Sequence, residues 1–255
     1  MRLKVGAFCE RCLSPSNTSY WHCPVCLEGA WGFCHLCVNK GYHCTHPLLQ
    51  VAHISTQYPT ASPVEVASKH RTVPLPHLPE HSYIVVPIQQ DCDICQYPIP
   101  PSNTRYHCNI CNNGDYDVCN ECYYSLVAAG KISQANGPNG WRRCLKNHRM
   151  ATIGFQDTAG GSQQRVVVRE PVGGWALKED LNAVSSSTSL LPPDGGVGLK
   201  CLALWNRFVG DEVPDELSFP KNAEVREVER MNEDWYWGVY AGGKGLFPGN
   251  HVRVL

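Results

Sequence analysis

Cysteine spacing constrains this chain more than any other feature of its sequence. Between residues 92 and 148 there are three C-x2-C pairs, followed by a cysteine and a histidine separated by three residues. A C-x2-C pair on a tight turn points two thiolates at one metal centre about 2.3 Å away. Repetition of that pair within so short a stretch favours zinc over buried thiols or disulfides, because two tetrahedral ions need eight ligands. The eight candidates are Cys92, Cys95, Cys108, Cys111, Cys119, Cys122, Cys144 and His148.

The first fifty residues repeat this plan. Seven residues separate the second C-x2-C pair from the third in both copies, and the aromatic residue and histidine before the second pair also recur. We therefore predict a tandem repeat of two small modules, each with too few apolar residues to fold without metal. The candidate ligands of the first copy are Cys9, Cys12, Cys23, Cys26, Cys34, Cys37, Cys44 and His46.

Both copies resemble the ZZ-type zinc finger, most clearly in residues 116–123. The resemblance implies that the first and third pairs share one ion, while the second pair shares another ion with the closing residues. Four zinc ions are then expected on the chain. Cys44 and Cys144 stand where the family often has histidine, and a thiolate replaces imidazole readily on zinc. His43 is an alternative to Cys44 or His46, which the sequence leaves open.

Composition places proline-rich and glycine-rich stretches around the cysteine arrays. We predict a first finger at 1–53, a proline-rich linker at 54–86, a second finger at 87–153, a Gly/Ser-rich linker at 154–196 and a C-terminal domain at 197–255. The proline-rich linker is expected to be an extended, semi-rigid spacer. Its Pro76 and Pro79 form a P-x-x-P motif preceded by Arg71, which suggests that it folds back onto the C-terminal domain and masks it.

The C-terminal region resembles an SH3 domain through five short motifs in family order. They lie at residues 203–205, 215–219, 234–238, 245–250 and 252–254. The expected fold is therefore small zinc-stabilised β-hairpin modules and an all-β SH3-like barrel, joined by flexible linkers. The resemblance implies a groove for proline-rich peptides, since such domains accept a preformed polyproline II helix.

The resemblance also implies which residues line this groove, because the family's motifs can be matched to positions in this sequence. The family usually has tyrosine at the places of Trp205 and His251, and Phe208 is assigned to the second aromatic place. An acidic loop is expected to pair with a basic residue beside the ligand prolines. The implied peptide-binding residues are Trp205, Phe208, Asp211, Glu212, Asp215, Glu216, Trp235, Pro248, Asn250 and His251.

The second finger has carboxylates at the places where several ZZ-type fingers hold the α-amino group of a partner. These are Asp93, Asp115 and Asp117, and together they would suit an ammonium ion. Alternatively, Asp115 and Asp117 only brace the turn by accepting hydrogen bonds from backbone amides. The first finger has Ala30 and Gly32 in the last two places, so amine capture is expected of the second finger alone.

These features predict a non-enzymatic adaptor. A zinc ion with four protein ligands has no open position for substrate, and the sequence contains no phosphate loop, H-E-x-x-H helix or G-x-S-x-G elbow. A RING-type ligase would end in a further C-x2-C pair. A net charge of −1 argues against nucleic acid as partner. The remaining alternative is a regulatory subunit whose catalytic domain lies on another chain.

Fifteen cysteines without an apolar leader or membrane span favour a reducing, intracellular location, either cytoplasm or nucleus. Cys201 lies far from both arrays and has no evident partner there.

Overall fold

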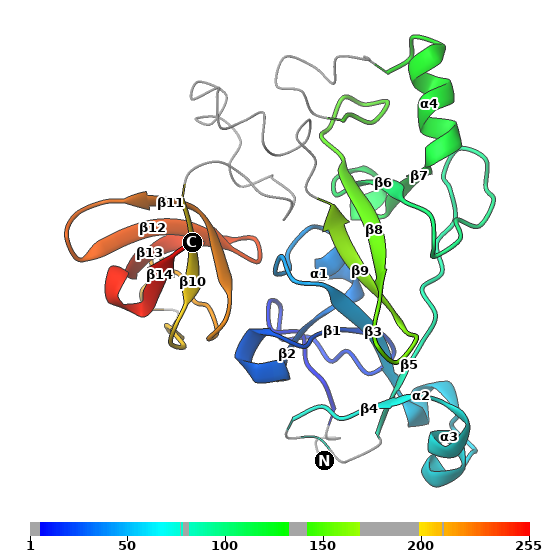
Figure 1. The fold of residues 1–255 in the computed structure, drawn as a ribbon, viewed down its shortest axis with the longest axis horizontal. Coiled ribbons are helices and arrows are strands. Elements are labelled where there is room, and N and C mark those ends of the chain that lie inside the picture. Colours follow the sequence, from blue (N-terminus) through cyan, green and yellow to red (C-terminus); the bar gives the residue numbers. More distant parts are fainter. Residues whose placement is uncertain (1–5, 77, 79–81, 133–141, 169–198, 211) are drawn as a thin grey trace.

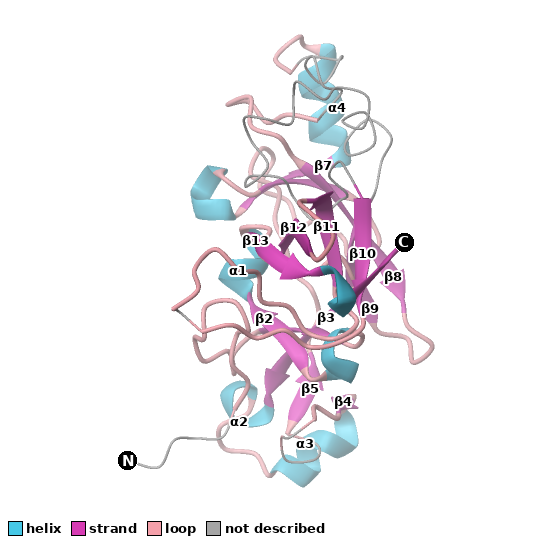
Figure 2. Cartoon of the chain, turned by 90° about the vertical axis from the view of Figure 1, so that its left-hand side faces the viewer, coloured by secondary structure: helices cyan, strands magenta, loops and turns pink. Residues whose placement is uncertain are grey.

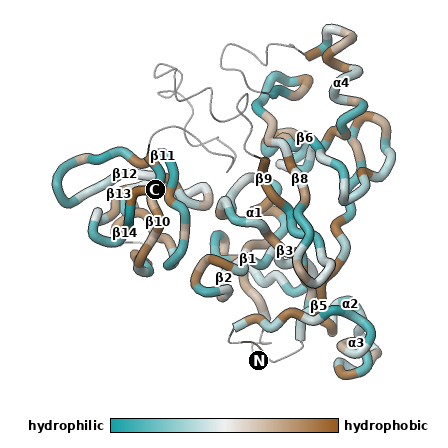
Figure 3. The backbone as a smooth tube through the Cα atoms, in the orientation of Figure 1, coloured by the Kyte–Doolittle hydropathy of each residue, from teal (hydrophilic) through white to brown (hydrophobic). Residues whose placement is uncertain are grey.

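The structure is a computed structural model, and it describes residues 6–76, 78, 82–132, 142–168, 199–210 and 212–255 (Figure 1). Two antiparallel sheets account for most of it. The larger has nine strands, and the smaller has five. Hydrophobic residues are spread in short stretches over all units, as expected for small modules rather than one large core (Figure 3). Within the described residues, none of the helices has the length and apolarity that crossing a membrane requires.

The two cysteine arrays fold alike. In each, a β-hairpin is followed by a helix whose first turn begins at the third C-x2-C pair. The first cysteine of the second pair ends the first strand, and the second cysteine begins a short 3-10 turn. The cysteine that precedes each helix, Cys34 or Cys119, is its N-cap. The first finger contains β1 (Tyr20–Cys23), η1 (Cys26–Gly29), β2 (Trp31–Cys34), α1 (His35–Asn39) and β3 (Leu48–His53). The second contains β6 (Arg105–Cys108), η2 (Cys111–Gly114), β7 (Tyr116–Cys119), α4 (Asn120–Ala128) and β8 (Ala151–Asp157).

A single strand, β9 (Gln163–Val168), joins the two fingers into one sheet. It pairs with β8 along its whole length and with β3 through Arg165 and Gln164, so the path runs β2-β1-β3-β9-β8-β6-β7. The Gly/Ser-rich stretch expected to be a linker therefore begins with a hairpin that ties the fingers together. Its turn contains Gly161 with φ +76°, a conformation that favours glycine. Residues 169–198 lie outside the described part of the chain.

The proline-rich stretch is folded rather than an extended spacer. It forms α2 (Ile54–Gln57), α3 (Pro63–Lys69), β4 (Thr72–Val73) and β5 (Tyr83–Val85), and β5 adds to the sheet beside β3. Proline at the first position of α3 needs no backbone donor, so it starts the helix instead of breaking it. Ile54, Val66 and Ile84 form a small core within the stretch, and Leu75 and Tyr83 pack against residues of the first finger. Arg71 donates hydrogen bonds to Thr158 and Ser162 of the β8–β9 turn, so this basic residue is held by the hairpin.

The C-terminal region forms the five-stranded sheet, with order β13-β12-β11-β10-β14 (Figure 2). We call residues 199–255 the C-terminal module. Its elements are β10 (Leu199–Ala203), β11 (Glu224–Arg230), β12 (Trp235–Tyr240), β13 (Gly243–Pro248), η6 (Gly249–His251) and β14 (Val252–Val254). The expected SH3-like barrel is not closed, because β13 and β14 end the described ladder without pairing to each other. The register shifts along β11, and Phe219 and Phe247, both fully buried, pack edge to face in the core of the module.

Candidate metal centres and peptide groove

The structure brings the sixteen predicted ligands together in four groups of four. In each finger the first and third C-x2-C pairs form one group, and the second pair forms another with the closing cysteine and histidine. Within every group the ligand atoms all lie within 4.8 Å of one another. The groups are Cys9, Cys12, Cys34 and Cys37; Cys23, Cys26, Cys44 and His46; Cys92, Cys95, Cys119 and Cys122; Cys108, Cys111, Cys144 and His148.

Donor type and spacing in these groups fit zinc. A tetrahedral ion with bonds of about 2.3 Å holds its sulfur atoms about 3.8 Å apart. The sulfurs of Cys12 and Cys34 are 3.7 Å apart, and those of Cys111 and Cys144 are 3.8 Å apart. In both mixed groups Nδ1 of the histidine is 3.3 Å from a thiol sulfur, that of Cys26 or Cys111. Four ligands complete each site, so the bound ions would have a structural role.

The lowered pKa values of two thiols in these groups also favour binding of a cation. A hydrogen bond with Cys37 lowers the pKa of Cys9 to about 4, although burial opposes this, and raises the pKa of Cys37 itself. The corresponding bond with Cys108 lowers the pKa of Cys144 to about 5. One thiol in each of these groups is thus held as a thiolate at neutral pH, and the thiolate is the form that binds metal.

His43, the alternative ligand, is placed elsewhere. Its Nδ1 lies 2.6 Å from the backbone oxygen of Cys44, and its Nε2 lies 3.2 Å from a guanidinium nitrogen of Arg165. Complete burial and the charge of Arg165 hold the pKa of His43 well below its usual range. The neutral ring therefore donates from Nδ1 and accepts at Nε2, which fixes β9 to the first finger and leaves Cys44 and His46 to the metal group.

The three aspartates of the second finger have separate partners. Asp117 is buried and pairs with Arg105 at 2.7 Å and with His107 at 3.1 Å. Burial opposes its ionisation, but the charges of His107 and Arg105 hold the pKa of Asp117 at about 2. Asp93 accepts a hydrogen bond from the backbone amide of Asp117 at 2.7 Å. Asp115 accepts from the side chain of Asn39 in the first finger at 2.9 Å.

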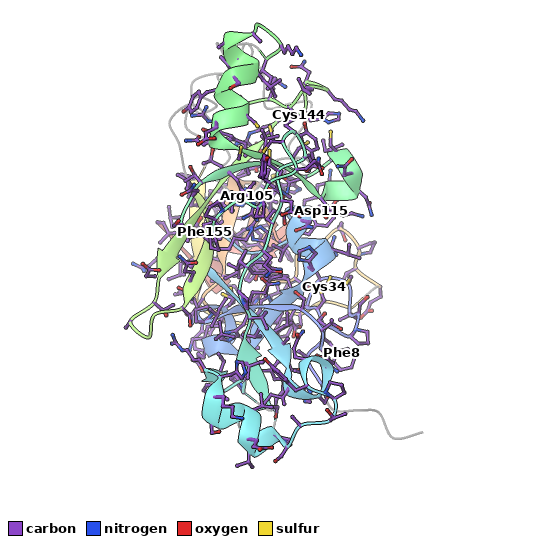
Figure 4. All side chains as sticks on the ribbon, turned by 90° about the vertical axis from the view of Figure 1, so that its right-hand side faces the viewer. Phe8, Cys34, Arg105, Asp115, Cys144 and Phe155 are labelled. Carbon is purple, nitrogen blue, oxygen red and sulfur yellow. The ribbon has the colours of Figure 1, made fainter. Side chains whose placement is uncertain are left out.

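The bond between Asp115 and Asn39 places the acidic residues beside the contact between the two fingers, which we call the seam. Figure 4 shows Arg105, Asp115 and Phe155 between the two metal-binding ends marked by Cys34 and Cys144. A cavity of about 800 Å³ opens there. Among its lining residues are Asp91, Asp93, Asp115 and four prolines of the second finger, and His35 of the first. Two of the three predicted carboxylates, Asp93 and Asp115, therefore face one cavity, whereas Asp117 forms an internal ion pair with Arg105.

In the C-terminal module the predicted ridge residues lie on strands and turns at one edge. Trp205 has an exposed fraction of 64%, Trp235 and Pro248 are opposite each other in the β12–β13 ladder, and Asn250 and His251 lie in η6. The backbone oxygen of Asp215 accepts a hydrogen bond from the backbone N–H of Leu246, and Glu212 lies in the same loop. Asp211 lies outside the described residues.

Two residues near the groove differ from expectation. Phe208, assigned to the second aromatic place, instead stacks on Trp31 of the first finger, with ring centroids 5.8 Å apart. Arg207 lies beside the ridge: its guanidinium is 5.8 Å from the ring centroid of Trp235 and pairs with Glu216. Arg207 directly precedes Phe208, so the sequence indicated this position to within one residue. Which of the two side chains points toward the ridge depends on the tertiary fold, because the loop is irregular.

Comparison with known proteins finds partial similarities, and no family model matches the chain. The chain is 35% identical over 77 residues to "Hematopoietic lineage cell-specific protein" of Mus musculus, which covers 30% of this chain and 15% of that protein. It is 31% identical over 87 residues to "Protein csh3" of Schizosaccharomyces pombe, covering 31% and 29%. SH3 domain 1 of Rho GTPase-activating protein 10 from Homo sapiens shares 29% identity over 22% of this chain and 80% of that domain, with a TM-score of 0.20.

The chain thus spans less than a third of either curated relative. Its neighbours include an SH3 domain, and its cysteine-rich groups are consistent with zinc fingers.

Proposed function

We propose that this protein is a non-enzymatic adaptor in which two ZZ-type fingers, stabilised by four zinc ions, present a C-terminal SH3 domain that binds proline-rich protein segments. The observation that carries the peptide-binding role is the ridge formed by the exposed Trp205 and the half-buried Trp235 and Pro248. None of the described contacts between the C-terminal module and the first finger involves these residues. A polyproline II helix packs on such a ridge at low entropic cost because its conformation is already formed.

Charge in the groove supports the same role. Glu212 and Asp215 lie in the loop beside the ridge, and among the described residues Glu216 pairs with Arg207. The remaining carboxylates suit a basic residue next to the ligand prolines. Bivalent binding through a finger and the groove would raise avidity by effective concentration.

Calorimetric titration of the zinc-loaded full chain with a proline-rich peptide carrying one flanking arginine tests this proposal. We expect Trp205→Ala to weaken binding by about 30-fold, the effect of removing a central aromatic contact. Val254→Ala is a matched control, because Val254 is also exposed but lies on β14 away from the ridge. Peptide binding that is absent from the wild type, or equal in both variants, would contradict the proposal.

A second candidate role is capture of a protein N-terminus by the second finger. It is supported by the cavity at the seam, where Asp93 and Asp115 face the same space. Burial raises the pKa of Asp93, so a cationic ligand would be favoured there because it relieves the cost of the buried carboxylate. Binding of one peptide with a free and with an acetylated N-terminus should differ by at least about tenfold, as expected for one charge-assisted bond. Equal affinities would remove this role.

A further inference from the structure

The first finger and the C-terminal module share one hydrophobic core. The cluster that contains the thiols of Cys23, Cys26 and Cys44 continues without a break into Tyr240 and Phe247 of the module. The second finger has a separate core that includes no residue of the module. Figure 1 shows the module beside the end of the first finger that carries β1 and β2.

The contacts concentrate on the turn that carries Cys26. The backbone N–H of Leu27 donates to the oxygen of Lys221 at 2.9 Å, and the side chain of Asn222 donates to the oxygen of Val25 at 3.3 Å. The ammonium of Lys221 lies 2.7 Å from the carboxylate of Glu28. The module therefore holds both sides of a metal-ligand turn.

One contact reaches a ligand atom directly. The hydroxyl of Tyr240, a buried residue, lies 3.5 Å from the sulfur of Cys26. Groups that hydrogen-bond to metal ligands orient them, and their removal commonly lowers metal affinity by about 10- to 100-fold. Here the supporting group comes from a residue more than two hundred positions further along the chain.

The backbone of the turn gives an independent sign of this arrangement. Leu27 and Glu28 have φ of 48° and 55°, a left-handed conformation that bulky residues rarely adopt. The second finger makes the same turn with Asn112 and Asn113, at φ of 51° and 59°, and asparagine tolerates it well. In the first finger the strain is offset because Leu27 packs on the shared core and Glu28 pairs with Lys221.

We propose that the C-terminal module docks on the metal site formed by Cys23, Cys26, Cys44 and His46, and that zinc occupancy of this site and docking of the module stabilise each other. Coupling of this kind is reciprocal: if zinc favours docking, docking favours zinc by the same factor. Cys9 and Cys37 of the neighbouring site also belong to the shared core. Within the described residues, however, only the site of Cys26 has hydrogen bonds from the module to a ligand atom and to the turn that carries it, so we expect one ion of four to depend on these bonds. This inference rests on the metal sites of the proposed function and not on peptide binding.

Two measurements on the zinc-loaded full chain test the coupling. Hydrogen exchange follows the amide of Leu27, with the amide of Asn112 at the equivalent place in the second finger as internal reference. Native mass spectrometry counts zinc ions during challenge with a chelator. We expect the Leu27 amide to exchange at least about tenfold more slowly than that of Asn112, and Phe208→Ala to remove this protection because it deletes the stack on Trp31. The same variant should release one ion about tenfold faster, within the usual range of allosteric coupling.

Trp205→Ala is the matched control, since it deletes an exposed aromatic side chain of the same module without touching the first finger. If Phe208→Ala leaves the Leu27 amide protected, the double variant Phe208→Ala, Tyr240→Phe removes a second contact. The proposal is overturned if Leu27 is unprotected in the wild type, if the double variant changes neither measurement, or if protection is lost while all four ions leave at their wild-type rates. A wild type that binds fewer than four ions but keeps Leu27 protected would count against the proposed metal sites instead.

Discussion

The two fingers form the same kinds of ligand group, with the same gap between their second and third C-x2-C pairs, yet their surfaces are used differently. The first finger places its Cys26 turn and Trp31 against the C-terminal module. Within the described residues, the equivalent turn of the second finger makes no hydrogen bond to the module, and this finger places Asp93 at a cavity on the seam. Two fingers with the same metal sites can therefore contact different partners. Four ligands at each site fix the backbone, whereas the other side chains remain free to diverge.

The largest expected effect comes from removing one metal ligand in either finger. Cys26→Ser and Cys111→Ser should each lose one ion and unfold the local structure, since the binding energy of a structural zinc ion is about 10 kcal/mol or more. Only Cys26→Ser should also release the C-terminal module. Small-angle scattering measures this as an increase in radius of gyration. An equal increase for Cys111→Ser would break the comparison between the fingers.

A smaller difference is expected at the glycine that ends each metal-ligand turn. Gly114 has φ +94°, and an added Cβ would lie 3.0 Å from Lys40 and 3.1 Å from the backbone oxygen of Asn109. Gly29 has φ +90°, but its nearest neighbour would be 3.6 Å away. Both substitutions by alanine strain the backbone by about 1 kcal/mol.

Gly114→Ala should cost about 1–2 kcal/mol more, because the clash displaces the first finger from the seam. Thermal unfolding of the two variants at fixed zinc concentration measures the difference. A greater loss of stability for Gly29→Ala would contradict the packed seam.

The smallest effect is expected from exchanging the residues that adopt the left-handed conformation. Asn112→Leu should destabilise the second finger by about 1 kcal/mol, since leucine lacks the tolerance of asparagine for positive φ. Leu27→Asn should relieve strain of the same size in the first finger but expose part of the shared core. Denaturant titration should therefore find Leu27→Asn destabilising as well. A stabilising Leu27→Asn would mean that the module contributes little to this turn.

Much of the candidate site could be predicted from local sequence. Cysteine pairs bring their thiolates together through one turn, so their spacing alone indicated the sixteen ligands that the structure gathers in four groups. The repeat further indicated that both copies fold alike. The aspartates were identified by position, but whether each was free or paired was not predictable. Arg105 lies on the neighbouring strand, and its contact with Asp117 depends on strand register.

The sequence by itself determined what is local: the ligand pairs, the turns that carry them and the motifs of the C-terminal module. Tertiary structure decided what those parts contact. Strand β9 lies in a stretch with little hydrophobic periodicity, and it joins the fingers because Arg165 meets His43 across a distance of 122 residues. Phe208 does not lie on the ridge, because its ring stacks on Trp31 of the first finger. Metal ligation follows from spacing along the chain, whereas docking depends on shape and polar partners that only the folded chain brings together.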